Sequence, residues 1–242
     1  GDSYHRFSRT DMQKAMAEAA DKGNNNFSHF GPEANLFRDL EDCFRNYGET
    51  GSGRRRFYVH KEVEARKYGY PEVQPGEFTP WEPLPEGSDL LFYEGLHGCV
   101  ATSEVNVAQH ADLRIGVVPV INLEWIQKIH RDTQTRGYVD TEVMSTILRR
   151  MHDYVHYIVP QFKLTDIKFQ RVPVVDTSDP IIARDIPTLD ESLVVIRFKK
   201  PDRFRIDFPF LVKMLKDSWM SRRNTIVVPG GKMGLAIELI IT

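Results

Sequence analysis

The chain has 242 residues, of which 41% are hydrophobic and 27% are charged, a balance typical of a soluble globular protein. Its 32 lysine and arginine residues are matched by 34 aspartate and glutamate residues, so the formal charge of −2 argues against a broad nucleic-acid interface. Two cysteines provide neither a disulfide framework nor a metal-binding spacing, and no apolar run is long enough to cross a membrane. These totals predict a cytoplasmic protein that binds neither nucleic acid nor membrane.

Residues 1–9 are rich in acidic, imidazole and guanidinium side chains and contain hardly any aliphatic ones. Such a segment is typical of a loop that leaves the end of a strand, where α/β proteins place their chemistry. The carboxylate of Asp2 could accept a proton from a substrate hydroxyl, and His5 and Arg9 could hold that substrate by a phosphate. A charged turn without a catalytic role is the alternative.

Two helices are predicted next. The first covers residues 11–22 and ends at Gly23, and a polar loop follows over residues 24–31. From Pro32 onward, apolar side chains recur three or four residues apart, which predicts a second helix that ends at Gly48. The apolar side chains of that helix are Leu36, Phe37, Leu40, Cys43, Phe44 and Tyr47.

A basic stretch, residues 51–60, leads from this helix to a short predicted strand and contains Arg54, Arg55 and Arg56. Three adjacent guanidinium groups could bind an anion or RNA, although a solvated loop is the more frequent reason for such a run. The five prolines between residues 71 and 85 then predict a surface loop without regular structure.

Residues 90–97 read as a buried strand, with Glu94 near its end and Gly95 turning the chain away. A carboxylate that closes an apolar strand costs free energy unless it is paired, solvated or close to a metal ion. In nucleotide-binding sheets such a residue serves Mg²⁺. An acid at a strand end in open water is the equally plain alternative.

The most apolar segment, residues 115–121, also reads as a buried strand. Asn122 is expected to cap the helix that follows it, and Glu124 in the first turn suits the helix dipole. The apolar side chains at helical spacing, which should face the core, are Leu123, Ile126 and Ile129.

The polar side chains of the same helix lie outside that apolar stripe. Lys128 and Asp132, and Asp132 and Arg136, are four residues apart, so one carboxylate should lie among cations on the solvent-facing side, together with Arg131. An enzyme that handles phosphates could use such a row, because phosphoryl transfer needs positive charge around the moving group. An ordinary solvated helix face is the alternative.

The remaining pattern predicts a helix from Asp140 with Val143, Ile147 and Met151 inside, and further elements at residues 169–175, 193–198, 206–220, 225–228 and 235–241. The second, third and fifth of these six segments read as strands and the others as helices. This alternation predicts an α/β fold with a mainly parallel sheet covered by helices on both faces.

Two further motifs do not qualify as functional sites. The pair His152 and His156 mimics a zinc-protease helix, but the general-base glutamate and a third ligand are missing. Residues 228–234 combine a strand, glycines and a lysine, but the Ser or Thr of a phosphate-binding loop is replaced by Met233. That segment is therefore interpreted as a turn.

Five motifs occur in one order along the chain: residues 1–6, 26–29, 58–60, 92–97 and 130–137. In this order they resemble the uridine-kinase-like P-loop kinases and, within that group, the bacterial phosphoribulokinases. Longer runs carry the same resemblance over essentially the whole chain; they are residues 93–98, 117–132, 158–162 and 171–178.

The resemblance implies a single kinase-like domain over residues 1–242, with a mixed sheet, that transfers the γ-phosphoryl of ATP to the C1 hydroxyl of ribulose 5-phosphate. By matching position, Asp2 would be the general base, Glu94 and Asp132 would serve Mg²⁺, and Lys128 would stabilise charge on the transferring group. The side chains implied to surround the sugar phosphate are His5, Arg9, Tyr58, His60, Arg131 and Arg136. Arg149 and Arg150 match positions tied to the lid and its regulation. NADH as an activator and an octameric assembly follow only by analogy.

One departure from the family pattern concerns the Walker A loop, which should lie upstream of Asp2 and has no counterpart here. We therefore expect the chain to be truncated before Gly1 and after Thr242, to lack an N-terminal strand, and to be inactive alone. Two alternatives stay open: a uridine-type nucleoside kinase, and a non-catalytic regulatory protein without the phosphate loop. A set of cations around the acceptor favours a phosphorylated substrate over a neutral nucleoside.

Overall fold

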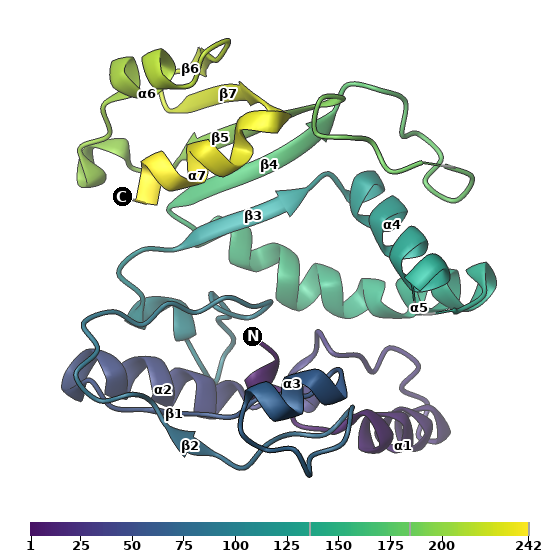
Figure 1. Cartoon of the computed structure of the whole chain (residues 1–242). Helices are drawn as coiled ribbons and strands as arrows, with labels where there is room; N and C mark the ends of the chain where they lie inside the picture. The colour runs from purple at the N-terminus through teal and green to yellow at the C-terminus, as the bar shows by residue number, and fades with distance from the viewer. Residues whose placement is uncertain (136, 184, 242) are drawn as a thin grey trace. The chain divides into compact units, whose positions relative to one another are not determined.

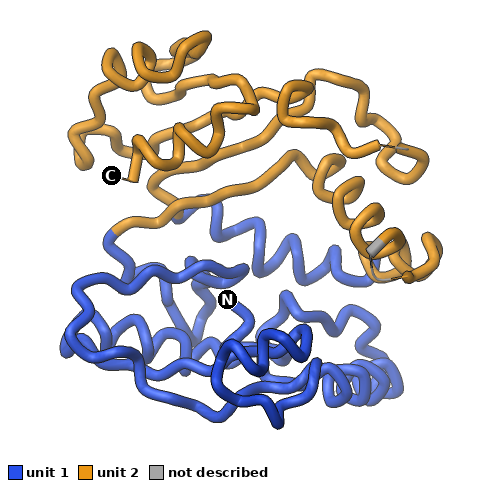
Figure 2. The backbone as a smooth tube through the Cα atoms, in the orientation of Figure 1, with its two compact units in different colours: residues 1–112, 148–164 blue, residues 113–147, 165–242 orange. Residues whose placement is uncertain are grey.

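The computed structural model describes residues 1–135, 137–183 and 185–241 (Figure 1). The chain divides into two compact units (Figure 2). Unit 1 comprises residues 1–112 and 148–164, and unit 2 comprises residues 113–147 and 165–242. The single-domain organisation, the missing N-terminal strand and the truncation stay predictions. Over the described residues, no helix is long and apolar enough to cross a membrane.

Unit 1 is mostly helical and has one short β-ribbon. Its elements are α1 (Arg9–Asp21), α2 (Phe37–Thr50), β1 (Arg54–Arg55), α3 (Glu62–Lys67), β2 (Glu82–Pro83), and 3-10 turns at Asp2–Tyr4, Pro32–Ala34, Val107–His110 and Val159–Lys163. The boundary between the units falls within α5 (Asp140–Asp153), which continues as a π-helical turn over Tyr154–Ile158. The proline-rich segment is irregular except for β2, which pairs antiparallel with β1.

The helix ends follow local capping chemistry. The Ser8 side chain accepts from the backbone of Asp11 and starts α1, which ends at the residue before Lys22. The second helix does not end at Gly48 as predicted, because it continues to Thr50 and stops at Gly51, whose φ is +71°. Glycine adopts this left-handed conformation without steric cost, so Gly51 rather than Gly48 provides the stop.

The hydrophobic core of unit 1 lies between α2, the Asp2–Tyr4 turn and the segment that contains Tyr93. Its buried members are Tyr4, Phe37, Leu40, Cys43, Val100, Val105 and Val107. The predicted buried strand at residues 90–97 is wrong, since this segment forms no strand and Leu90 and Phe92 are 78% and 75% exposed. An apolar run without alternation does not define a strand unless a neighbouring strand pairs with it.

Unit 2 contains a five-stranded sheet in the order β3-β4-β5-β7-β6. Its elements are β3 (Ile115–Pro119), α4 (Ile121–His130), β4 (Ile167–Pro173), β5 (Ser192–Phe198), α6 (Phe208–Met214), β6 (Trp219–Arg222), β7 (Thr225–Pro229) and α7 (Met233–Ile241). A π-helical turn over Arg131–Thr135 extends α4, and a 3-10 turn over Pro201–Phe204 precedes α6.

The sheet is mixed, as predicted, but it is not mainly parallel. In the part of the chain that the structure describes, only β3 and β4 pair parallel, while β4–β5, β5–β7 and β6–β7 pair antiparallel. The β3–β4 crossover contains α4 and α5, the kind of long connection that a parallel pair requires. A tight turn joins β6 and β7 and permits antiparallel pairing, whereas β4–β5 and β5–β7 pair antiparallel across long connections.

One face of this sheet carries the hydrophobic core of unit 2. Alternating residues of β4, β5 and β7 pack against α6 and α7, which lie over that face in Figure 1. The largest fully buried side chains of this core are Phe169, Phe198, Ile167, Ile196, Leu215 and Ile226. Helices on the second face stay a prediction.

Three local predictions in unit 2 are wrong. β3 is an edge strand rather than a buried one, so Val117 is 55% exposed. Asn122 does not cap α4, which begins at Ile121; its side-chain amide instead donates to the carbonyl of Thr177. The helix expected over residues 206–220 is only α6, because Asp207 caps its start and the chain turns at Asp217 (φ +65°) into β6.

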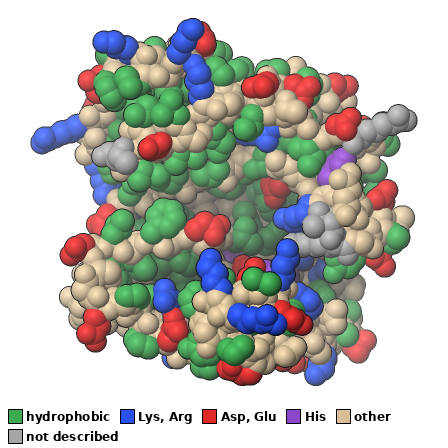
Figure 3. Space-filling view, in the orientation of Figure 1, with side chains coloured by type: hydrophobic (Ala, Val, Ile, Leu, Met, Phe, Trp, Pro, Cys, Tyr) green, Lys and Arg blue, Asp and Glu red, His purple; other side chains and the backbone are tan. Residues whose placement is uncertain are grey.

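The space-filling view in Figure 3 shows acidic and basic side chains interspersed over the face that it presents. No single sign of charge covers that face, in agreement with the near-neutral composition. The three consecutive arginines in unit 1 are also engaged within the protein. Arg54 pairs with Asp39 and Arg55 pairs with Glu82. These ion pairs give Arg54 and Arg55 a structural role in unit 1.

Candidate functional site

The carboxylate of Asp2 lies between two imidazoles in unit 1. Its Oδ1 is 3.4 Å from Nε2 of His5, and its Oδ2 is 3.1 Å from Nε2 of His60. The hydrogen bond from His5 is the main cause that lowers the pKa of Asp2 far below its usual range; partial burial opposes this shift, and the charge of His60 adds to it. Asp2 is therefore an anion at neutral pH, ready to accept a hydrogen bond.

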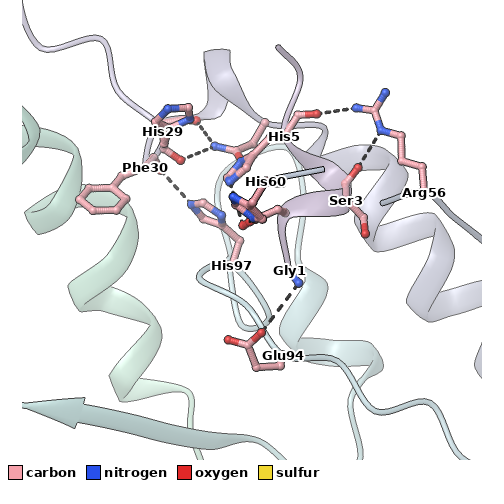
Figure 4. A network of polar contacts seen from close by, with 12 residues as sticks. Gly1, Ser3, His5, His29, Phe30, Arg56, His60, Glu94 and His97 are labelled. Carbon is pink, nitrogen blue, oxygen red and sulfur yellow. Dashed lines mark hydrogen bonds and ion pairs between the residues drawn. The ribbon is translucent and has the colours of Figure 1, made fainter. Parts of the chain in front are cut away.

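Contacts of Tyr4 and Arg56 hold the turn that carries Asp2 in place. Tyr4 is buried, and its hydroxyl donates to the carbonyl of Arg54 at 2.8 Å. The guanidinium of Arg56 donates to the carbonyls of Ser3 (2.9 Å) and His5 (2.5 Å), as Figure 4 shows. Arg56 also stacks over the ring of Phe78, with its central carbon 3.7 Å from the ring centroid.

The segment with Tyr58 and His60 approaches this turn because of a buried residue between them. Val59 is fully buried and exchanges backbone hydrogen bonds with Gly76 and Glu77, which leaves its two neighbours on the outer side. The two aromatic rings lie edge to face, 4.9 Å apart. His60 thus lies beside Asp2 and Tyr58 lies beside His60, whereas their role at the sugar phosphate stays a prediction.

Arg9 joins the same region through the backbone. Its amide donates to the carbonyl of Gly76 at 2.8 Å, so the start of α1 is tied to the segment that forms backbone hydrogen bonds with Val59. Gly76 has φ +100°, and a Cβ there would lie 2.8 Å from that of Arg9, so only glycine fits. The side chain of Arg9 is exposed and can reach an anionic ligand.

Glu94 lies beside the Asp2 turn because two glycines pack backbone against backbone. A Cβ on Gly1 would lie only 2.5 Å from Cα of Gly95, which shows how closely the segments approach. The Glu94 side chain is 85% exposed, and its Oε2 is 4.0 Å from the nitrogen of Gly1 (Figure 4). Its carboxylate oxygens are therefore accessible, and oxygen donors of this kind are what Mg²⁺ prefers.

A buried histidine, His97, and a half-buried one, His29, lie close to this site, and the sequence analysis did not single them out. His97 is 4% exposed, and burial lowers its pKa to about 4. Burial lowers the pKa of His29 to about 3, with a further contribution from the charge of Arg150. Figure 4 shows the imidazoles of His5, His60 and His97 in one region of unit 1. Both rings are thus neutral at physiological pH.

Arg149 and Arg150 lie at the end of α5, in unit 1. The guanidinium of Arg149 donates to the carbonyl of Phe27 at 2.5 Å, and burial lowers its pKa. Arg150 lies over the ring of Phe30, 5.6 Å from the centroid. These contacts tie both side chains to the loop between α1 and α2.

The second group of predicted site residues lies in unit 2, where α4 passes into its π-helical turn. Lys128 forms an ion pair with Oδ2 of Asp132, and Arg131 Nε donates to Oδ1 of the same carboxylate at 3.1 Å. Asp132 is 5% exposed, so the prediction that it lies on the solvent-facing side is wrong. Arg136 lies outside the described residues.

The buried carboxylate keeps its charge because of these two cations. Burial raises the pKa of Asp132, but the hydrogen bonds and charges of Lys128 and Arg131 outweigh this and lower it below the usual range. The prediction that Leu123, Ile126 and Ile129 face the core is confirmed, since all three are buried. A π-helical turn is a frequent feature of functional sites.

The two motifs that were set aside have structural roles. His152 and His156 stack 4.3 Å apart, and among the described residues no three His, Cys, Asp or Glu side chains form a group that could hold a metal ion. The Gly230–Lys232 segment forms a 3-10 turn in which Lys232 contacts Asp217. The interpretation of that segment as a turn is confirmed.

Comparisons with known proteins agree with the resemblance seen in the sequence. The model of the "Phosphoribulokinase / Uridine kinase family" matches residues 1–178. The chain is 62% identical over 242 residues to the phosphoribulokinase of Nitrobacter vulgaris. This match covers 100% of this chain and 82% of that protein. It is 60% identical over its whole length to phosphoribulokinase 2 of Cereibacter sphaeroides, of which it covers 81%.

A solved structure extends the comparison to the fold. The phosphoribulokinase from Rhodobacter spheroides superposes with a TM-score of 0.90 at 59% identity, over 100% of this chain and 82% of that one. A likeness of this extent covers the segments that carry Asp2, Glu94 and Asp132 alike. The chain therefore belongs to the phosphoribulokinase/uridine kinase family.

Proposed function

We propose that this protein is a phosphoribulokinase, which transfers the γ-phosphoryl of ATP to the C1 hydroxyl of D-ribulose 5-phosphate. The product, ribulose 1,5-bisphosphate, is the substrate of carbon fixation in the Calvin cycle. The observation that carries the proposal is the anionic carboxylate of Asp2 between two imidazoles, in a chain about 60% identical to phosphoribulokinases over its whole length.

Asp2 is the residue that orients the attacking hydroxyl. A carboxylate with so low a pKa is a weak base, but phosphoryl transfer passes through a loose transition state that needs little proton transfer early on. The C1 hydroxyl donates a hydrogen bond to Asp2, and its proton moves to the carboxylate as the new O–P bond forms. Positioning is then the main contribution of Asp2.

Glu94 and Asp132 are proposed to serve the Mg²⁺ that accompanies ATP. Glu94 offers exposed carboxylate oxygens, and Asp132 is held anionic by its neighbours, so both have the donor chemistry that fits the ion. Mg²⁺ takes few ligands from the protein and most from phosphates and water, so a group of three carboxylates is not required. When bound, the ion would neutralise charge on the phosphate oxygens. Lys128 contributes positive charge to the transferring group.

Cationic and polar side chains are proposed to bind the sugar phosphate. They are His5, Arg9, Tyr58, His60, Arg131 and Arg136. A phosphorylated acceptor would use this charge, whereas a neutral nucleoside would not. This is the reason to prefer ribulose 5-phosphate over uridine. Arg149 and Arg150 are proposed to act on the lid and its regulation.

NADH as an activator, an octameric assembly and a cytoplasmic location remain proposals by resemblance. A feature that fits an anionic effector is the second face of the sheet in unit 2. There, Lys168 and Arg197 are cross-strand partners on β4 and β5, pointing away from the core that contains Phe169. Burial, with the charges of Arg197 and Lys199, lowers the pKa of Lys168. An anion at this face would relieve the repulsion.

The direct test compares acceptors on the protein as its gene encodes it. With MgATP, ribulose 5-phosphate should be turned over with a much higher kcat/KM than uridine. Faster turnover of uridine would assign the protein to the nucleoside kinases. No turnover of either acceptor, in a folded protein that binds ATP, would favour the regulatory alternative.

A further inference from the structure

The side chain of Asn35 has only one possible orientation. Its amide nitrogen lies 2.9 Å from the carbonyl oxygen of His29 and 2.7 Å from that of Gly31. Both partners are acceptors, so the NH₂ group must face them. The amide oxygen then faces Nδ1 of His5, at 2.7 Å. Since Asn35 is 3% exposed, water cannot easily replace these partners.

This orientation determines which nitrogen of His5 carries a proton. An amide oxygen can only accept, so Nδ1 of His5 must be the donor in a bond of this length. Backbone pairing holds the two residues in place, because His5 and Asn35 form an antiparallel bridge and the amide of Arg6 donates to the carbonyl of Ala34. The tautomer of His5 is therefore a consequence of Asn35.

The other nitrogen of His5 faces the acid. Nε2 lies 3.4 Å from Oδ1 of Asp2. Since Nδ1 is committed to Asn35, Nε2 is the ring nitrogen that His5 presents to the carboxylate. The other groups around the ring are His29, whose ring centroid is 5.3 Å away, and His60 across the carboxylate.

We propose that Asn35 is a positioning residue that holds His5 protonated on Nδ1, so that Nε2 of His5 faces Asp2 and the carboxylate stays available to the acceptor hydroxyl. This inference rests on the proposed role of Asp2. It deepens that role, because the surroundings of Asp2 depend on the buried amide of Asn35, 33 positions away in the sequence. Asn35 itself has no contact with Asp2 among the described interactions. His5 is then held in place beside the acceptor.

The chain offers a matched control for this amide. Gln161 is also buried, its oxygen accepts from the backbone of Cys99, and its nitrogen donates to the carbonyls of Leu96 and Tyr157. Gln161 thus has three hydrogen-bond partners, as Asn35 has, but among the described hydrogen bonds all of its partners are backbone groups and none is an imidazole. Gln161→Leu should weaken the fold as Asn35→Leu does, without changing His5.

The experiment is nitrogen-15 NMR of the protein labelled at histidine, with the signals of His5 identified by their loss in His5→Gln. The wild type should show a protonated Nδ1 at neutral pH. Asn35→Leu should lose this fixed state, whereas Asn35→Asp, which keeps an acceptor, should retain it. Gln161→Leu should leave the signals of His5 unchanged. Measurement on the wild type alone already decides the tautomer if the leucine variant does not fold.

The kinetic counterpart is the KM for ribulose 5-phosphate, which should rise about tenfold in Asn35→Leu while the KM for ATP stays within about twofold, because the lost contribution is binding of the acceptor. An unprotonated Nδ1 in the wild type, or unchanged His5 signals in Asn35→Leu, would overturn the inference. Failure of Asp2→Asn to reduce turnover would instead remove the proposed role of Asp2 and leave the tautomer result standing.

Discussion

Nε2 of His60 lies 3.1 Å from Oδ2 of Asp2, although 58 residues separate the two in the sequence. The contact depends on Val59, which is fully buried and anchors the segment that presents His60. With His5 on the other carboxylate oxygen, Asp2 is an acid flanked by two imidazoles, and its pKa is lowered. Substitution of Asp2 can therefore test whether this carboxylate acts in catalysis.

Replacement of Asp2 by Asn should lower kcat by at least the roughly 10²–10⁴-fold that a general base typically contributes. The reason is that an amide cannot accept the proton of the C1 hydroxyl. Steady-state kinetics with ribulose 5-phosphate and MgATP measure the effect. Asp11→Asn is the matched control, because Asp11 is also an acid near a helix start but contacts only Ser8 and Lys14. Near-normal turnover of Asp2→Asn would exclude Asp2 from the mechanism.

Replacement of Lys128 by Met should lower the free energy of unfolding by about 1–3 kcal/mol, since the buried carboxylate of Asp132 would lose one of its cationic partners. Urea denaturation measures this change. The control is Lys14→Met, whose exposed pair with Asp11 should contribute less than about 0.5 kcal/mol. Equal effects of the two variants would show that the buried pair adds no particular stability.

The parts of this fold that the sequence predicts well are those set by short-range periodicity. Leu123, Ile126 and Ile129 follow the helical repeat, and all three are buried. Lys128 and Asp132 are four residues apart on the same helix surface, and they form the expected ion pair. These relationships depend only on helix geometry, so no knowledge of distant segments is needed.

The errors arise where a distant segment decides the outcome. Leu90 and Phe92 look like a buried strand, but pairing depends on a neighbour that the local pattern does not contain. Asn35 and Arg56 were not singled out as site residues, because their partners, His5 and the carbonyl of Ser3, are 30 and 53 residues away. The local signal for Asn35 is an asparagine between the loop that contains His29 and the apolar helix that follows.

Replacement of Arg56 by Lys should lower kcat/KM for ribulose 5-phosphate about tenfold, because one ammonium group cannot reproduce the two hydrogen bonds and the stacking that fix the turn of Asp2. Arg55→Lys is the matched control. Arg55 pairs with Glu82 and lies over Phe57, so its substitution disturbs the same ribbon without touching the turn. If both variants lost activity equally, the effect would come from the ribbon and not from the turn.

The last prediction concerns pH and the buried ring of His97. Its pKa is lowered from 6.5 to about 4, mainly by burial, because the charged form loses its hydration inside the protein. Between these two values the unfolded chain binds a proton that the folded protein does not bind. Stability therefore falls as the pH decreases from 6.5 toward 4, and it is fully present above 6.5.

His97 should account for a loss of about 2 kcal/mol between pH 7.5 and pH 5, as an order of magnitude. His97→Gln cannot titrate but keeps an N–H donor for the carbonyl of Phe30, which lies 3.1 Å from Nε2 of the native ring. The variant should therefore lose less stability than the wild type over this range, as measured by urea denaturation at both pH values. His156→Gln, at an exposed position, should behave like the wild type. If His97→Gln and the wild type lost the same amount of stability, acid sensitivity would have to come from other groups, because the only difference between them in this range is the proton that His97 takes up on unfolding.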